Sequence, residues 1–175
     1  EHTGKEILIG SNETEIVIVD ITNKANPIKL SSINYANVGY VHQGWFTQDM
    51  RYFLLGDEID EMRFGNKTRT IIFDFSDLDN PQFSFNYFGP TDAIDHNGYV
   101  KNNTFYLANY TAGIRIIDIT NIANKSMTEV GFFDTYPTNN IAGFNGAWSV
   151  YPYFESGNIV ISDIDNGLFI VRKSQ

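Results

Sequence analysis

The chain has 175 residues, a formal charge of −9 and no cysteine, and 15% of its residues are aromatic. Its length suits one domain with a sizeable core, whereas its acidity argues against a nucleic-acid groove and against electrostatic binding to anionic lipid. The lack of cysteine excludes a disulfide scaffold and thiolate chemistry, and no apolar run reaches transmembrane length. The many Phe and Tyr residues favour β structure.

A short phrase recurs along the chain: an apolar strand, an aspartate and, two residues later, a serine or threonine. Three copies stand at residues 18–23 (IVDITN), 72–77 (IFDFSD) and 116–121 (IIDITN). Because a short carboxylate can accept a hydrogen bond from the backbone ahead of it, the phrase predicts a strand that ends in a turn. A fourth copy at residues 167–171 (GLFIV) has Arg172 in place of the aspartate.

A second phrase precedes three predicted hairpins. Its copies are residues 42–45 (HQGW), 96–99 (HNGY) and 145–148 (NGAW), and the second strands of these hairpins end at Asp57, Asn109 and Asp163. Counting from the turns places His42 opposite Gly56 and Asp57, His96 near Asn109, and Asn145 near Asp163. An imidazole and a carboxylate are therefore expected to meet at the open end of the first hairpin.

These repeats predict an all-β fold. The aspartates of the first phrase are separated by 54 residues (Asp20 to Asp74) and 44 residues (Asp74 to Asp118), with almost no helical periodicity. That period is typical of a β-propeller with blades of four antiparallel strands and no helix longer than about two turns. A β-sandwich would explain the strand spacing but not the matching phrases. The predicted blade units are residues 1–35, 36–88, 89–136 and 137–175.

The predicted strands do not make a whole number of blades. The first unit lacks its innermost strand and the last unit lacks its outermost one, which leaves about fourteen strands. A propeller must close to protect its sheet edges. We therefore expect this chain to be the C-terminal half of a larger propeller of about seven blades, completed by the remainder of the propeller or by another protein chain.

The second unit carries an acidic insertion. Asp57 and Asp74 are 17 residues apart, whereas Asn109 and Asp118 are 9 apart, and the extra residues fall within 58–67. In a propeller this loop lies on the same face as His42, His96 and Asn145, and loops on a rigid scaffold often carry function. The closely spaced acids are Asp57, Glu58, Asp60 and Glu61. Because they repel one another, we expect at least one to contact a cation, an Arg or Lys, or backbone amides, with His42 in the same site.

Hard oxygen donors on this face suit Ca²⁺ or Mg²⁺, and the histidines would add affinity for Zn²⁺. A divalent cation, calcium first, is therefore the candidate cofactor, and otherwise none is expected, since no fixed spacing motif supports a metal site. The alternative is a solvated acidic loop with structural histidines. The ligand or metal candidates are His42, Asp57, Glu58, Asp60, Glu61, Asp95, His96, Asn109, Asn145 and Asp163. Trp45, Tyr99 and Trp148 are expected in the blade core, and no catalytic motif is found.

Five Asn-x-Ser/Thr triplets occur, beginning at Asn12, Asn66, Asn102, Asn109 and Asn124. Several fall in predicted turns, as glycan acceptors require, and they favour a secreted glycoprotein. The alternative is an asparagine-rich sequence in which the triplets have no meaning.

Several segments resemble the LVIVD-repeat propellers, and most closely the choice-of-anchor B family of exported surface proteins. The matching pieces are residues 17–22 (VIVDIT), 42–61, 95–99 (DHNGY), 113–121 (GIRIIDITN), 145–152 (NGAWSVYP) and 156–171. The resemblance implies a propeller that is secreted or located at the cell surface. The family brings no established catalytic residues to this sequence.

Three functions are compatible with these observations. The first is an extracellular or cell-surface β-propeller that serves as a binding or structural module in a surface or appendage assembly. The second is a metal-dependent hydrolase or lyase that uses the face with His42, Asp57 and His96. The third is a purely structural propeller stiffened by calcium. No nucleic-acid partner and no transmembrane segment are expected.

Overall fold

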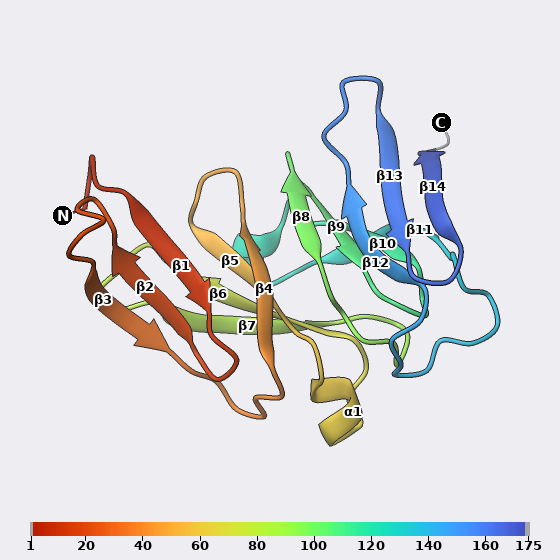
Figure 1. Ribbon diagram of the computed structural model, residues 1–175, viewed down its shortest axis with the longest axis horizontal. Helices are drawn as coiled ribbons and strands as arrows, with labels where there is room; N and C mark the ends of the chain where they lie inside the picture. The colour runs from red at the N-terminus through yellow and green to blue at the C-terminus, as the bar shows by residue number, and fades with distance from the viewer. Residues whose placement is uncertain (1, 174–175) are drawn as a thin grey trace.

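The computed structural model describes residues 2–173 and consists almost wholly of antiparallel strands. Four antiparallel sheets follow one another in chain order and stand side by side (Figure 1). The first sheet contains β1 (Ile7–Ser11), β2 (Ile16–Asp20) and β3 (Ile28–Ile33). The last contains β12 (Ala147–Tyr151), β13 (Asn158–Asp163) and β14 (Gly167–Arg172).

The two middle sheets are complete four-stranded blades with simple up-and-down order. The second sheet contains β4 (Val41–Phe46), β5 (Tyr52–Asp57), β6 (Arg69–Asp74) and β7 (Gln82–Phe88). The third contains β8 (Gly98–Lys101), β9 (Thr104–Ala108), β10 (Ile114–Asp118) and β11 (Thr128–Phe133). The expected all-β propeller architecture is confirmed.

Helices are short in the part of the chain that the structure describes. They are α1 (Asp60–Phe64), which lies in the acidic insertion, and the 3₁₀ helix η1 (Ile122–Asn124). Neither exceeds two turns, as the sequence predicted. Within residues 2–173, no helix has the length and apolar character needed to cross a membrane.

The first repeated phrase forms the predicted turn in all three copies. Asp20, at the end of β2, accepts a hydrogen bond from the backbone N–H of Thr22 at 2.9 Å. The carboxylates of Asp74 and Asp118 accept the equivalent bonds from Ser76 and Thr120 at 2.9 Å and 2.8 Å. Each aspartate therefore ends its strand by bonding the backbone two residues ahead.

The core lies between neighbouring sheets rather than at one centre. Three buried clusters separate the first sheet from the second, the second from the third and the third from the fourth. All six residues of β5 are buried because both faces of its sheet are covered. Leu54 packs toward the third sheet, and Phe53 and Leu55 pack toward the first. Burial on both faces explains why these strands are apolar without alternation.

The innermost strands β4, β8 and β12 lie close to one another. The glycine of the second phrase has a packing role there, because a Cβ on Gly44 would overlap the ring of Phe53. A Cβ on Gly98 would overlap the ring of Phe105 in the same way. In both blades the glycine lets a phenylalanine of the second strand pack against the innermost strand.

Two of the three aromatic residues of the second phrase are exposed, contrary to expectation. Trp45 is 39% exposed and Trp148 is 47% exposed. Tyr99 is half-buried and packs against the core cluster between the third and fourth sheets, as expected.

Candidate functional site

The structure brings three of the predicted residues together between the second and third sheets. We call His42, Glu58 and His96 the His–Glu–His group. Val41 pairs with Asp57 and Gln43 pairs with Gly56, so that His42 is the extra residue of a β-bulge. A bulge re-aims the side chain of the extra residue. Glu58 directly follows β5, and His96 lies two residues before β8.

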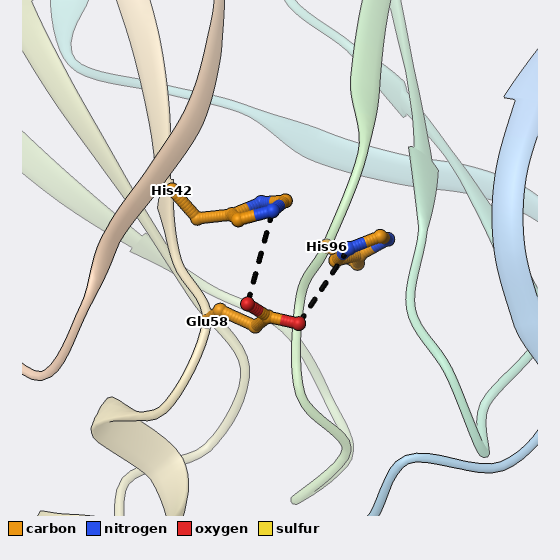
Figure 2. A group of neighbouring side chains, drawn as sticks. All are labelled: His42, Glu58 and His96. Carbon is orange, nitrogen blue, oxygen red and sulfur yellow. Dashed lines mark ion pairs between the residues drawn. The ribbon is translucent and has the colours of Figure 1, made fainter. Parts of the chain in front are cut away.

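The carboxylate of Glu58 faces both imidazoles (Figure 2). Its Oε2 lies 3.8 Å from Nε2 of His42, and its Oε1 lies 3.5 Å from Nε2 of His96. The two rings are stacked, with centroids 4.5 Å apart and an angle of 23° between their planes. The side chain of His96 is 2% exposed and that of His42 is 26% exposed, so the group opens to solvent on the side of His42.

The neighbours of His96 determine which of its ring nitrogens carries the proton. Its Nδ1 lies 2.6 Å from the carbonyl oxygen of Trp148, which can only accept a hydrogen bond. The amide Nδ2 of Asn97 also lies 2.8 Å from Nδ1, and it donates to the same Trp148 carbonyl at 3.0 Å. The shorter contact of Nδ1 with this carbonyl assigns the proton to Nδ1 and leaves the lone pair of Nε2 toward Glu58. Burial lowers the pKa of His96 more than the bond to Trp148 raises it, so the neutral imidazole is favoured.

Glu58 is held from the opposite side by Tyr110. The Tyr110 hydroxyl donates to Oε1 of Glu58 at 2.7 Å. Burial raises the pKa of Tyr110, and the hydrogen bond to Glu58 raises it further, so the hydroxyl keeps its proton and remains a donor. The Tyr110 side chain is fully buried, which fixes the position of this contact.

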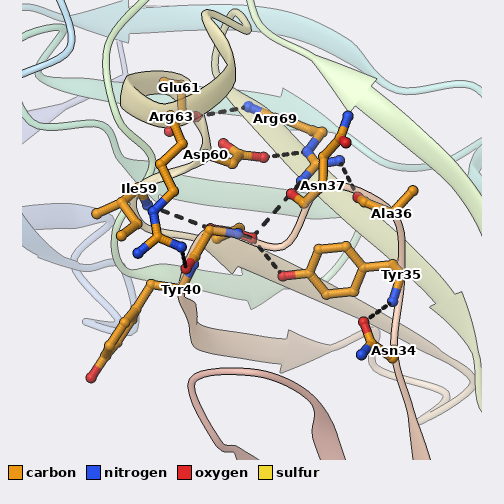
Figure 3. Close-up of polar contacts among 12 residues, drawn as sticks. Asn34, Tyr35, Ala36, Asn37, Tyr40, Ile59, Asp60, Glu61, Arg63 and Arg69 are labelled. Carbon is orange, nitrogen blue, oxygen red and sulfur yellow. Dashed lines mark hydrogen bonds and ion pairs between the residues drawn. The ribbon is translucent and has the colours of Figure 1, made fainter.

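A second group lies beneath the acidic insertion. We call Asp57, Asp60, Glu61, Asp95 and Arg69 the carboxylate–arginine cluster, and each of its members is at most 4% exposed. Arg69 pairs with Asp60 through Nε, and its backbone N–H donates to Glu61 at 3.1 Å (Figure 3). The insertion is therefore folded against its blade, and the alternative of a solvated acidic loop is wrong.

Asp57 is satisfied by the backbone that leads into β4. Its Oδ2 accepts hydrogen bonds from the N–H of Gly39 at 2.6 Å and from the Tyr35 hydroxyl at 2.8 Å. Its Oδ1 accepts from the N–H of Tyr40 at 2.5 Å. Side chains alternate along a strand, so Asp57 points away from the His–Glu–His group. The predicted register, with His42 opposite Gly56 and Asp57, is confirmed, but the carboxylate that faces His42 belongs to Glu58 rather than to Asp57.

The carboxylate–arginine cluster holds four acids and one arginine, so its charges do not balance. Both carboxylate oxygens of Asp95 are buried without a hydrogen-bond partner. Burial raises the pKa of Asp95 well above its ordinary value, and the nearby Glu61 and Asp60 raise it further. Burial also raises the pKa of Glu61 and of Asp60. These raised pKa values favour the neutral forms of Asp95 and Glu61, which would reduce the repulsion within the cluster.

The expectation that an acid of the insertion contacts an arginine or backbone amides is confirmed by Asp60 and Asp57. His42 shares its site with Glu58 rather than with these two acids. Within residues 2–173, the His–Glu–His group is the one set of three or more such donors whose ligand atoms all lie within 4.8 Å of one another. The oxygen set expected for calcium is not gathered at one point, and calcium stays a prediction.

The remaining candidates lie outside both groups. The side-chain amide of Asn109 donates to the carbonyls of Ala93 and Ile94 at 2.9 Å and so supports the loop before His96. Asn145 lies two residues before Ala147, the strand partner of Asp163, and its side chain bonds to Asp165 at 3.0 Å rather than to Asp163. Asp163 instead closes a turn by accepting the N–H groups of Asp165 and Asn166.

The glycan candidates differ in accessibility. Asn12, Asn102 and Asn124 are exposed, and Asn66 is half-buried. Asn109 is 1% exposed and its amide nitrogen is fully used, so this asparagine cannot accept a glycan in the folded chain. That expectation was wrong because the residue ends a blade strand rather than lying in an open turn.

Comparison with known proteins supports the fold. The family model for the LVIVD repeat matches residues 7–36 and 99–135. A search of curated proteins gives no match. Over these two segments the chain is similar to the LVIVD repeat, and its fold is of the β-propeller type.

Three solved structures illustrate the likeness. The periplasmic gluconolactonase of Pseudomonas aeruginosa has a TM-score of 0.71 and 12% identity, over 99% of this chain and 51% of that one. A protein from Lactobacillus plantarum has a TM-score of 0.69 and 12% identity, over 95% and 52%. The WD40 repeats of RRP9 have a TM-score of 0.57 and 12% identity, over 95% and 47%. Such identities show the fold alone, and the chain spans about half the length of these structures.

Proposed function

We propose that this chain is part of a secreted or cell-surface β-propeller that acts as a binding or structural module in a surface or appendage assembly. The observation that carries the proposal is an aromatic wall formed by Trp45 on β4, Tyr99 on β8, Tyr151 on β12 and Tyr153 in the segment after β12. Exposed aromatic side chains that lie together are typical of binding surfaces, because they offer large apolar area with a polar tip.

The aromatic wall is continuous across the second, third and fourth sheets. The rings of Trp45 and Tyr99 are 4.9 Å apart between centroids, and those of Tyr99 and Tyr153 are 6.4 Å apart. Tyr151 extends the series, with its ring 5.4 Å from that of Tyr153 and 48% of its surface exposed. Trp148 is also exposed, but its ring lies 4.4 Å from that of His96 and 6.1 Å from that of Tyr110 rather than against the wall.

The sheet edges support a role within a larger assembly. On β14, which has a partner on one side only, Leu168 is 64% exposed and Ile170 is 62% exposed. An apolar edge of this kind is a template for pairing with another strand. The likeness to propellers about twice as long supports the idea that the remainder of a propeller, or another chain, covers this edge.

Intrinsic fluorescence tests the binding role, because Trp45, one of the two tryptophans of the chain, belongs to the aromatic wall. Surface glycans and appendage proteins from the source cells would be titrated into the full chain. We expect a saturable change in emission, and isothermal calorimetry should show that the Trp45→Ala variant no longer binds. Saturable binding with unchanged emission would contradict a role for the wall. Protease treatment of intact source cells tests location, and protection of the chain until lysis would contradict surface exposure.

The second candidate is a metal-dependent hydrolase or lyase, and the observation that favours it is the approach of His42 and His96 to one carboxylate. The acid in such a site would be Glu58 rather than Asp57. The name of the gluconolactonase relative does not support this candidate, because 12% identity shows only the fold. Turnover of ester, lactone or glycoside substrates that depends on added metal would favour this function over the binding module.

A further inference from the structure

We propose that His42, Glu58 and His96 bind a single divalent transition-metal ion, for which Zn²⁺ is the best match. This metal site goes beyond the binding role proposed above and does not depend on it. The three ligands come from the bulge in β4, the residue after β5 and the segment before β8. The ion would therefore join the innermost parts of two neighbouring blades.

The spacing of the donor atoms fits a metal ion. Zinc lies about 2.0–2.2 Å from nitrogen and oxygen ligands, which places neighbouring tetrahedral donors about 3.3 Å apart. The carboxylate oxygens of Glu58 lie 3.5 Å from Nε2 of His96 and 3.8 Å from Nε2 of His42, and the three ligand atoms lie within 4.8 Å of one another. A small closure of the side chains would complete the coordination.

The hydrogen bonding of the His–Glu–His group is incomplete without a cation. The lone pair of Nε2 on His96 faces a carboxylate oxygen of Glu58, so two acceptors oppose each other. Within residues 2–173, neither ring nitrogen of His42 makes a hydrogen bond, and its Nδ1 is buried. Buried polar atoms without partners call for an explanation. An ion between the three side chains satisfies both imidazoles and the carboxylate together.

The surrounding contacts are those that support metal ligands in other proteins. A histidine that ligates a metal usually donates its other N–H to a carbonyl or carboxylate, and a ligating carboxylate is itself hydrogen-bonded. His96 donates Nδ1–H to the Trp148 carbonyl, and Glu58 accepts from the Tyr110 hydroxyl. Both supports are in place and hold the ligands in the required orientation.

The donor types select the class of metal. Two imidazole nitrogens and one carboxylate suit Zn²⁺ and other first-row transition metals, whereas Ca²⁺ takes six to eight oxygen ligands. Three protein ligands also leave a coordination position free. His42 borders a cavity of about 800 Å³ that is lined in addition by Trp45, Lys101 and Tyr153. A water molecule or a ligand in this cavity could fill the free position.

Titration with Zn²⁺ tests the site directly. The full chain, without an affinity tag, is stripped with chelator, dialysed and titrated by isothermal calorimetry, and the bound metal is then counted by mass spectrometry. We expect one Zn²⁺ per chain. His42→Gln and His96→Gln should each weaken binding by about 100-fold or more, since the loss of even an outer-shell contact costs up to about that factor. Ca²⁺ should not compete.

The third histidine of the chain supplies a matched control. His2 pairs with Asp79 at 2.9 Å on the surface of the first and second blades, so His2→Gln should keep wild-type affinity. Circular dichroism checks that each variant folds, and the partly exposed His42→Gln keeps the test valid if His96→Gln does not fold. Absence of bound Zn²⁺, equal affinity in His42→Gln and His2→Gln, or preference for Ca²⁺ would overturn the proposal.

Discussion

Arg69 supplies the positive charge of the carboxylate–arginine cluster. Its side chain is 5% exposed, pairs with Asp60 and lies 3.8 Å from Asp57. It also donates to the Asn37 carbonyl at 2.8 Å, which fixes the segment before β4. A single residue at the start of β6 thus holds both the acidic insertion and the approach to His42.

Replacement of Arg69 by methionine should destabilise the chain strongly, because it leaves buried carboxylates without a counter-ion. We expect a loss of about 3–5 kcal/mol in the free energy of unfolding, measured by urea denaturation. Arg51→Met is the control, since Arg51 pairs with Asp74 at the surface with 50% of its side chain exposed, and it should cost at most about 1 kcal/mol. Equal losses in the two variants would contradict a buried cluster.

Tyr110 should influence metal binding without touching the ion. Tyr110→Phe removes the donor to Glu58 and leaves the ring in place. We expect Zn²⁺ affinity to fall by about tenfold, as for other outer-shell contacts, with one ion still bound per chain. Calorimetry of the variant checks this, with Tyr136→Phe as the control. An unchanged affinity would mean that Tyr110 does not position Glu58.

Part of the site could be predicted from the sequence, residue by residue. The sequence placed His42, His96 and the acids on one face and anticipated a contact of the acids with arginine or backbone amides. The sequence could not show that Glu58 rather than Asp57 faces His42, because this contact depends on the bulge at His42 and on the alternation of side chains at the end of β5. Arg69, Tyr110 and the Trp148 carbonyl were missed, since their roles arise only when distant strands pack together.

Among the elements, the hairpins with an inner glycine show how local sequence sets packing between strands. Gly98 opens β8 and sits against the ring of Phe105 on β9, while Gly44 does the same for Phe53 in the preceding blade. The sequence revealed these elements because the same phrase recurs. It did not reveal α1, because that short helix is held by the contacts of Asp60 and Glu61 with Arg69 rather than by a capping side chain or by periodicity.

A methyl group at Gly98 should lower the stability of the fold. Gly98→Ala would push Cβ into the Phe105 ring, and overpacking of this kind destabilises by about 1–3 kcal/mol. Gly131, in β11, is the matched control, because its Cβ would meet only Ile116 at 3.8 Å. Thermal melting should show a clear drop for Gly98→Ala and little change for Gly131→Ala. The reverse order would contradict the described packing.

The turn after β6 should respond to pH through Asp74. The Arg51 guanidinium holds the pKa of Asp74 at about 2, below the value of about 3.9 for an unfolded aspartate. The ionised carboxylate therefore stabilises the fold above pH ~4, and this contribution is lost as pH falls through about 2. Asp74→Asn should be less stable than wild type at pH 6 by at most about 1 kcal/mol, and the gap should shrink at pH 3.

Urea denaturation at the two pH values measures that gap. Asn can still accept the N–H of Ser76, so the variant removes the charge and keeps the turn bond. A gap that is equal at both pH values would show that the ion pair with Arg51 does not contribute.

At the scale of the whole molecule, the innermost strands of successive blades bring distant residues to one place. His42 and His96 begin equivalent phrases in the second and third blades, and blade packing stacks their rings 4.5 Å apart. The repeat pattern made the propeller architecture predictable from sequence. It could not show that the aromatic residues beside the histidines face outward, because exposure depends on what covers the innermost strands.

Crystals of the protein grown with Zn²⁺ test the central inference most directly, by an anomalous difference map collected at the zinc absorption edge. We predict one strong peak between Nε2 of His42, Nε2 of His96 and the Glu58 carboxylate, within about 2.0–2.2 Å of each ligand atom. The same map from His2→Gln crystals should keep the peak, and that from His42→Gln should lose it. A map with no peak among these three side chains, or with zinc bound only elsewhere, would contradict the account.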